Sequence, residues 1–300
     1  MSLIIICGAT ATGKSELALL VAKELDAQIV NADSMQVYRG MDIGTAKLSL
    51  AERQEIPHHL LDLLEINQEA NVSWYQGLAR AKIDELLQSG KSVVVVGGTG
   101  LYIKAILDDL NFPDTDPAVR QQITDEAQLV GNDQMHQRLA KLDPAAALAI
   151  PKENIRRVIR ALEVIQITGK PFTANLPRQA SSKYPAAKQF GLVLDRENLD
   201  SKIDKRVEDM WAKGFVREVM QLMTKGLEQA TTAKMALGYS QIMNYLNGEC
   251  DEAFAKEETK RVTRAYARRQ ETWFSRDDRI KWLAPESNAA RLEKLLASIN

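Results

Sequence analysis

The sequence predicts an α/β fold in which helices flank both faces of a parallel sheet and a helical segment is inserted into the chain. In the first half, short apolar runs typical of buried strands alternate with stretches of helical spacing, which implies right-handed crossovers between parallel strands. A glycine-rich loop follows the first apolar run. From residue 112 the sequence becomes rich in Asp, Pro and Ala with helix-start signals, which indicates a second unit.

The first expected strand, Leu3 to Cys7, leads into Gly-Ala-Thr-Ala-Thr-Gly-Lys-Ser at residues 8–15. This G-x-x-x-x-G-K-[ST] spacing, followed by a helix over residues 16–25, is a phosphate-binding loop and predicts a P-loop NTPase-like core. Glycines let successive N–H groups point inward, Lys14 adds a cation, and the Ser15 hydroxyl can ligate Mg²⁺. Such loops commonly bind nucleoside triphosphates such as ATP, and less commonly a small diphosphate.

Two further expected strands end in side chains that can take part in chemistry. Gln28 to Ala32 is followed by Asp33, and Val93 to Val96 is followed by Gly-Gly-Thr-Gly, which contains Thr99. Ligands of an open parallel sheet lie beyond the carboxyl ends of its strands, so Asp33 and Thr99 should face whatever the phosphate loop holds. The alternative for Asp33 is a turn or helix-capping role.

The remaining elements complete this fold. We expect residues 34–67 to form a partly ordered functional loop with a short strand near residues 59–62. A helix over residues 74–88 should follow. Residues 112–189 form the expected insertion domain, with helix starts at Asp116-Pro117, Asp143-Pro144 and Pro151, and a long helix over residues 153–168. The core domain comprises residues 1–111 and 190–300, with a strand at 189–194 and helices at 199–213, 215–225 and 251–274.

Composition excludes several classes of protein. With 39 basic and 40 acidic residues, net charge neither indicates nor excludes a nucleic-acid partner. The 2 cysteines are too few for a disulfide framework or a zinc site. No apolar run reaches the roughly 20 residues of a membrane span and no charged leader is visible, so we expect a cytoplasmic protein without membrane contact. We also expect a monomer, although the sequence leaves the oligomeric state open.

The end of the third core strand weighs against ATP hydrolysis. A typical phosphate-loop kinase carries a magnesium-binding Asp after an apolar strand, whereas Val93 to Val96 ends in glycines. Asp33 could bind the metal instead. A small-molecule kinase of the same fold therefore remains the alternative enzyme.

Several segments, in this order along the chain, resemble the bacterial tRNA dimethylallyltransferase family, also called the tRNA isopentenyltransferase or IPP transferase family. They are the loop 8–15, Ala32-Asp-Ser-Met-Gln-Val-Tyr-Arg-Gly-Met-Asp-Ile-Gly-Thr-Ala-Lys47, Pro57-His-His-Leu60, Val96-Gly-Gly-Thr-Gly-Leu-Tyr102, Arg160-Ala-Leu-Glu-Val164 and Gly238-Tyr239. The resemblance extends to about Trp273. It implies transfer of a dimethylallyl group from dimethylallyl diphosphate to the exocyclic amine of adenosine 37 of tRNA, next to the anticodon.

The resemblance also implies roles for individual residues. Asp33 matches the general base that takes the proton from the amine, and Thr99 matches the residue that contacts the adenine. Arg206 matches an arginine that reaches the diphosphate, and Lys202 stands where relatives often have arginine. Mg²⁺ at Ser15 is the implied cofactor. The implied diphosphate-binding residues are Gly8, Ala9, Thr10, Ala11, Thr12, Gly13, Lys14, Ser15 and Arg206.

The implied partner is the anticodon stem-loop of tRNA, which the insertion domain would help to contact. The implied tRNA-contacting residues are Asp33, Ser34, Met35, Gln36, Thr99, Arg120, Arg156, Arg157, Val158, Ile159, Arg160, Ala236, Leu237, Gly238, Tyr239, Ser240, Gln241, Arg268, Arg269, Gln270, Glu271, Thr272, Trp273, Phe274 and Ser275.

One pattern supports an RNA-binding surface independently of the resemblance. Basic side chains recur every four residues along one expected helix, at Lys256, Lys260, Arg264 and Arg268. Because Glu257 and Glu258 share that helix, a solvated, salt-bridged face is the alternative. A tRNA-binding module without chemistry would explain the basic stripe but would leave Lys14 and Asp33 without a role.

Overall fold

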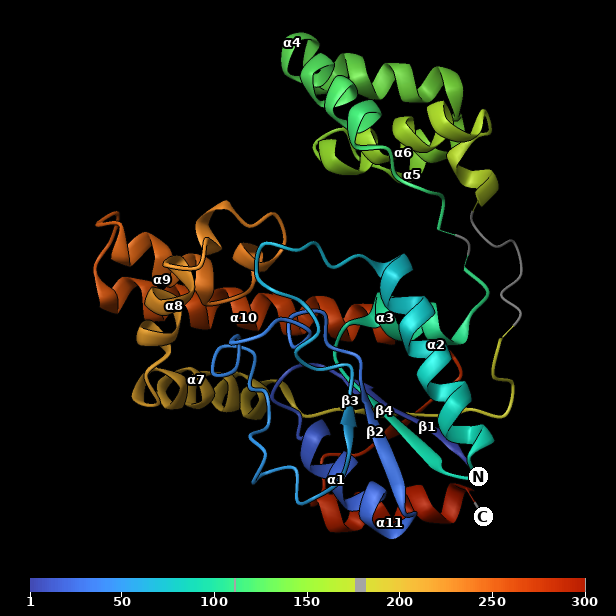
Figure 1. Cartoon of the computed structure of the whole chain (residues 1–300), viewed down its shortest axis with the longest axis vertical. Coiled ribbons are helices and arrows are strands. Elements are labelled where there is room, and N and C mark those ends of the chain that lie inside the picture. The colour runs from blue at the N-terminus through green and yellow to red at the C-terminus, as the bar shows by residue number, and fades with distance from the viewer. Residues whose placement is uncertain (111, 176–181, 300) are drawn as a thin grey trace. The chain divides into compact units, whose positions relative to one another are not determined.

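The computed structural model describes residues 1–110, 112–175 and 182–299 of the chain (Figure 1). These residues form two compact units. The first, which we call the core unit, comprises Met1–Leu107 and Tyr184–Asn300, and the second, the insertion unit, comprises Asp108–Lys183. Among the helices of the described segments, none is long and apolar enough to cross a membrane.

The core unit is built on a six-stranded sheet in the order β3-β2-β4-β1-β5-β6, and every neighbouring pair is parallel. The strands are β1 (Leu3–Gly8), β2 (Ala27–Asn31), β3 (His58–His59), β4 (Ser92–Val96), β5 (Lys188–Leu192) and β6 (Ile280–Leu283). The predicted α/β fold with a parallel sheet is therefore confirmed.

Helices cover both faces of this sheet. Neighbouring residues of β1 point to opposite faces, so apolar side chains of this strand contact helices on each side. Ile5 packs with residues of α2 and α3 on one face, whereas Ile4 and Ile6 pack with residues of α1 on the other. Further helices follow β5 and end the chain. The helices of the core unit are α1 (Lys14–Glu24), α2 (Val72–Gln88), α3 (Gly100–Leu107), α7 (Arg196–Ala212), α8 (Phe215–Met223), α9 (Tyr239–Leu246), α10 (Glu252–Phe274) and α11 (Asn288–Ile299).

The insertion unit is a helical bundle with its own apolar core. It comprises α4 (Pro117–Leu142), α5 (Pro144–Ala149), α6 (Ile155–Thr168) and the short 3-10 helix Phe172–Asn175. The Asp116 and Asp143 carboxylates accept hydrogen bonds from the first N–H groups of α4 and α5, which explains why those two helices start where the Asp-Pro pairs predict. Gly131, at φ 81°, interrupts α4.

Two local predictions differ from the structure, and four elements were not predicted. Pro151 precedes α6 instead of starting it, because the Asn154 side chain caps the helix by accepting from the N–H of Arg157. The strand expected at residues 59–62 is His58–His59, since Leu60 and Asp62 adopt left-handed φ values of 63° and 56° that no regular strand uses. The sequence did not predict α3, α9, β6 and α11, and the last of these contributes to the site below.

Candidate active site

A cavity of about 1290 Å³ opens in the core unit beyond the carboxyl ends of β1, β2 and β4. Its wall brings together the phosphate loop after β1, the Asp33–Gln36 turn after β2 and the Gly97-Gly98 pair after β4. Residues of α7, α10 and the loop 42–53 complete it. The three loops that the sequence predicted to converge therefore line one cavity.

The phosphate loop curls through backbone conformations that favour glycine. Gly8 has φ 134°, and a Cβ there would lie 2.7 Å from the carbonyl oxygen of Leu192 in the neighbouring strand. Gly13, at φ 93°, opens α1. The Lys14 ammonium folds back and donates to the carbonyl of Ala9 at 2.5 Å. Burial, and then the nearby Arg206 guanidinium, lower the pKa of Lys14 to about 8.

Arg206 reaches the phosphate loop from α7. Its guanidinium donates to the Thr10 hydroxyl at 3.4 Å, and burial lowers the pKa of Arg206. The position of this arginine follows from packing, since Ile203 on the same helix is buried against Ala9 and Ala11 of the loop. Two cations thus stand at the loop. Lys202 is exposed and does not line the cavity.

The Asp33 carboxylate lines the cavity and also shapes its own turn. Its Oδ1 accepts from the Met35 N–H at 2.8 Å, and its N–H donates to Asn31 at 3.0 Å. The turn-forming role and the site position are therefore compatible. Burial raises the pKa of Asp33 above its ordinary value, while the Met35 N–H and then the Lys14 ammonium oppose this rise.

Thr99 faces the same turn from the end of β4. Its Oγ1 accepts from the Ser34 N–H at 3.1 Å, which ties the Gly-Gly-Thr loop to the Asp33 turn. Tyr266 of α10 lines the same cavity, and burial raises the pKa of Tyr266 to about 12. Tyr266 was not among the site residues expected from the sequence.

Gln270 and Arg291 hold the phosphate loop from elements late in the chain. Gln270 is 6% exposed, accepts from the Thr10 N–H at 2.9 Å and donates to the Gly98 carbonyl at 2.8 Å. Arg291 of α11 is 2% exposed and donates to the Thr12 carbonyl at 3.2 Å. Gln270 had been expected to contact tRNA, whereas its amide is engaged with backbone groups here. Arg291 was missed because α11 was not predicted.

The other expected tRNA contacts differ in their surroundings. Ser34, Met35 and Gln36 line the cavity, as do Ala236 and Leu237. Gly238 and Tyr239 are buried beside α8, and Phe274 is buried against the sheet.

An open pocket of about 270 Å³ lies at the C-terminal end of α10. Its lining includes Trp273, whose side chain is 42% exposed, and a residue that the sequence analysis missed, Arg276. The other lining residues are Arg268, Arg269 and Thr272. An exposed aromatic ring beside three guanidinium groups is an arrangement that suits a stacked base and phosphates.

Most of the basic stripe on α10 is paired with α7. The ammonium groups of Lys256 and Lys260 contact Glu208 at 3.0 and 2.5 Å, and Arg264 pairs with Asp204. The salt-bridged alternative is thus correct for these three residues. Arg268, the fourth, lies at the pocket described above.

In the insertion unit, the carboxylate of Glu163 is fully buried and accepts from Arg120 at 2.8 Å and from Arg160 at 3.0 Å. Arg156 and Arg157 are exposed on the same helix, α6. Val158 is buried in the core of this unit, while Ile159 packs at its edge. Buried Glu163 therefore fixes two of the four arginines of this unit that were expected at the RNA.

A Mg²⁺ site fits these residues only together with substrate phosphates. The Ser15 hydroxyl stands at the start of α1 and lines the cavity, as does the Asp33 carboxylate. Within residues 1–110, 112–175 and 182–299, no cluster of three or more His, Cys, Asp or Glu could hold a metal ion. Mg²⁺ is commonly bound by one or two protein oxygens together with phosphate oxygens and water, and Ser15 provides such an oxygen.

Comparison with known proteins shows what this chain is similar to. A model of the IPP transferase family matches residues 36–277. A tRNA dimethylallyltransferase of Thermobifida fusca is 53% identical over 287 residues, which cover 94% of this chain and 89% of that protein. A tRNA dimethylallyltransferase of Streptomyces coelicolor is 50% identical over 281 residues, with 94% and 89% covered.

Solved structures agree with these matches. A tRNA isopentenylpyrophosphate transferase of Bacillus halodurans superposes with a TM-score of 0.72 at 34% identity, covering 99% of this chain and 96% of that one. A eukaryotic dimethylallyltransferase acting on tRNA superposes with a TM-score of 0.84 at 25% identity, covering 99% and 78%.

Proposed function

The chain belongs to the IPP transferase family and is a tRNA prenyltransferase, and from this premise we propose its reaction in detail. The dimethylallyl group of dimethylallyl diphosphate passes to the exocyclic amine of adenosine 37 of tRNA, which forms N6-isopentenyladenosine and releases diphosphate. The observation that best supports this proposal is that the phosphate loop, Arg206 and Asp33 line one cavity.

The donor end of this cavity is cationic. The phosphate-loop N–H groups, Lys14 and Arg206 would bind the diphosphate and stabilise the negative charge that grows on it as the allylic C–O bond breaks. Burial, and then the nearby Arg206 guanidinium, lower the pKa of Lys14, so its ammonium group would be stabilised by an anion bound beside it. A diphosphate in the loop would restore the ordinary preference of Lys14 for its charged form. Ser15 would hold Mg²⁺, which when bound neutralises further charge on the diphosphate.

The acceptor end contains a base. An aromatic amine is a poor nucleophile, so a carboxylate that takes its proton during attack can contribute roughly 10²–10⁴-fold. Burial raises the pKa of Asp33, which makes its carboxylate a stronger base, while Lys14 helps to keep it ionised. Thr99, held beside the Asp33 turn, would contact the adenine. The amine proton thus moves to the Asp33 carboxylate as the new C–N bond forms.

The acceptor adenosine must leave the stack of the anticodon loop to reach Asp33. Trp273 offers a stacking surface for an unstacked base, and Arg268, Arg269 and Arg276 beside it offer phosphate contacts. We propose that exposed Arg156 and Arg157 of the insertion unit contact the same RNA. Since tRNA is a cytoplasmic substrate, the enzyme would act in the cytoplasm, and a cavity assembled from one chain is compatible with a monomer.

One assay tests this function against its alternatives. Purified protein is incubated with Mg²⁺, tRNA and dimethylallyl diphosphate labelled in its carbon chain, with ATP labelled at the γ-phosphate as a competing donor. We expect carbon label in tRNA, at adenosine 37 after nuclease digestion. Phosphate transfer from ATP would instead indicate a kinase, and tRNA binding without incorporation of either label would indicate a binding module.

A further inference from the structure

The loop 42–47, here named the wall loop, carries the Asp-Ile-Gly-Thr-Ala-Lys part of the family motif, and the proposed reaction assigns it no role. It lines the same cavity as the phosphate loop and Asp33, although its backbone forms turns instead of a helix or strand. A turn segment of this kind keeps one shape only if side chains hold its backbone groups.

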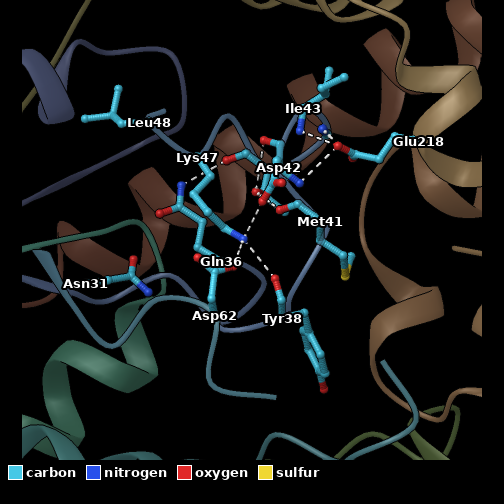
Figure 2. A network of polar contacts seen from close by, with 12 residues as sticks. Asn31, Gln36, Tyr38, Met41, Asp42, Ile43, Lys47, Leu48, Asp62 and Glu218 are labelled. Atoms are coloured by element: carbon cyan, nitrogen blue, oxygen red, sulfur yellow. Dashed lines mark hydrogen bonds and ion pairs between the residues drawn. The ribbon is translucent and has the colours of Figure 1, made fainter. Parts of the chain in front are cut away.

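Glu218 of α8 holds one side of the wall loop (Figure 2). Its Oε2 accepts from the N–H groups of Asp42 at 3.1 Å and Ile43 at 2.7 Å, and its Oε1 accepts from the Gly44 N–H at 3.2 Å. The same Oε1 accepts from the Tyr239 hydroxyl at 2.6 Å. A single carboxylate thus serves four donors, and three of them are successive N–H groups of the kind that bind anions.

Lys47 holds the other side of the wall loop. Its side chain is 2% exposed, and its ammonium contacts the Tyr38 carbonyl at 2.8 Å, Asp42 at 2.7 Å and Asp62 at 2.6 Å (Figure 2). An ammonium group has three donors, and all three find acceptors here. The Lys47 side chain therefore links the wall loop to the backbone of Tyr38.

The contacts of the wall loop extend to the segment that carries Asp33, the base of the proposed reaction. Tyr38 and Gln36 follow Asp33 in the same short segment, and the Gln36 side chain donates to the Thr45 carbonyl of the wall loop at 3.0 Å. Gly44 allows the loop to press against the helices behind it, because a Cβ there would lie 2.2 Å from the Phe215 ring. The wall loop therefore supports the Asp33 turn, and Glu218 in turn holds the wall loop by hydrogen bonds.

We propose that Glu218 is a positioning residue for prenyl transfer, which holds the wall loop against α8 so that Lys47 keeps the Asp33–Gln36 turn in its reactive place. This inference rests on the proposed function. The position of Lys47 gives it independent support, because the Lys47 ammonium is one of the charges that oppose the burial-driven rise in the pKa of Asp33. Loss of these contacts would therefore displace Asp33 and reduce the fraction of its carboxylate that is ionised.

The test compares Glu218→Ala and Glu218→Gln with Glu249→Gln, which changes an exposed carboxylate outside the site. In Glu218→Ala we expect faster hydrogen exchange of the amides of residues 42–44 and a kcat for labelled transfer that is about 10–100-fold lower, the usual cost of a misplaced group. The KM for dimethylallyl diphosphate should change less, because the phosphate loop rests on Gln270 and Arg291 instead. Glu218→Gln keeps one acceptor oxygen and should be intermediate.

A folded Glu218→Ala protein with wild-type kcat would overturn the proposal, as would unchanged exchange of the wall loop. If Glu218→Ala does not fold, Glu218→Gln decides by the same two measurements. A purely structural role would lower the melting temperature and leave kcat unchanged at a temperature where the variant is folded. If the wild-type enzyme itself transfers no label, the proposed function fails. The exchange experiment still tests whether Glu218 holds the wall loop.

Discussion

The side chain of Gln270 accepts a hydrogen bond from the backbone N–H of Thr10 at 2.9 Å, across 260 residues of sequence. Its amide nitrogen donates to the Gly98 carbonyl at 2.8 Å. A Cβ at residue 98 would lie 2.3 Å from that nitrogen, so a larger residue there would displace the Gln270 amide from this position. One buried amide thereby joins the phosphate loop to the loop that carries Thr99.

Replacing Gln270 should impair use of the donor more than binding of tRNA. Gln270→Ala leaves the Thr10 N–H and the Gly98 carbonyl unpaired, and we expect kcat/KM for dimethylallyl diphosphate to fall about 10–100-fold. Gln270→Glu should be at least as damaging, because its carboxylate faces the Gly98 carbonyl. Steady-state kinetics with both substrates measure this, with exposed Glu252→Gln as the control on the same helix. A selective loss of tRNA affinity would show that Gln270 contacts RNA.

Asp33→Asn should abolish most turnover and preserve binding. Asn can still accept from the Met35 N–H, so the turn remains while the base is lost, and we expect single-turnover rates about 10²–10⁴-fold lower. In the wild type, the rate should fall as pH decreases through the pKa of Asp33, which burial places above the ordinary 3.8. Asp33→Asn should remove this acidic limb. Near-normal rates in the variant would exclude the general-base role.

The same substitution should affect stability in the opposite direction. A carboxyl whose pKa is raised on folding binds more protons in the folded state, so it lowers stability as pH rises from about 4 through its folded pKa. Asp33→Asn should therefore raise the melting temperature at pH 7. Calorimetry at pH 7 and at pH 4 checks this, because the difference between the two proteins should shrink at the lower pH.

Affinity for the donor should fall as pH rises through about 8, where Lys14 loses its proton. Diphosphate favours the charged ammonium, so binding at pH 8 should take up protons. Titration calorimetry in HEPES and in Tris at pH 8 detects this uptake as a difference in apparent enthalpy. Lys14→Met is the control, and an equal proton uptake by this variant would assign the effect to another group.

Arg206 and Lys202 should differ in their effects on the donor. Hydrogen bonds to charged groups contribute about 1.5–3 kcal/mol, so Arg206→Ala should raise the KM for dimethylallyl diphosphate about 10–100-fold. Lys202→Ala changes an exposed side chain outside the cavity and should have little effect. Equal effects of both substitutions on KM would mean that Lys202 moves inward when the donor binds.

Glu163→Gln should destabilise the insertion unit. The fully buried carboxylate pairs with Arg120 and Arg160, and its loss leaves both guanidinium groups without their shared anion. Because both arginines are partly exposed to solvent, we expect a loss of about 1–3 kcal/mol, less than for a fully buried pair. Hydrogen exchange of peptides from α4 and α6 measures it locally. Asp133→Asn, which breaks the more exposed pair with Lys152, is the control and should change exchange little.

Local patterns were sufficient for strands β1, β2 and β4 and for the three loops that follow them. The alternation of strand and helix patterns predicted β1, β2 and β4, because neighbouring residues decide whether a strand can be buried. The phosphate loop was predicted for the same reason, since its glycines and Lys14 act within eight residues of sequence. Asp33 and Thr99 followed from the rule that parallel strands end at one edge.

Periodicity alone could not decide what the basic stripe of α10 does. The same spacing suits RNA phosphates and acidic partners equally, and the partners that decided it, Glu208 and Asp204, lie on α7. The roles of Gln270 and Glu218 were hidden for a related reason. A glutamine or a glutamate in a helix shows no sign in the sequence of the backbone groups it will meet.

The sequence by itself determined the parallel α/β core, the phosphate loop and the family, because these depend on residue types at short, regular spacings. Only the tertiary structure decided which side chains line the cavity and which hold its loops together. Gln270 at Thr10, Arg291 at Thr12 and Glu218 at the wall loop each join segments far apart in the chain. Such contacts depend on how helices pack on the sheet, and that packing is a property of the whole core.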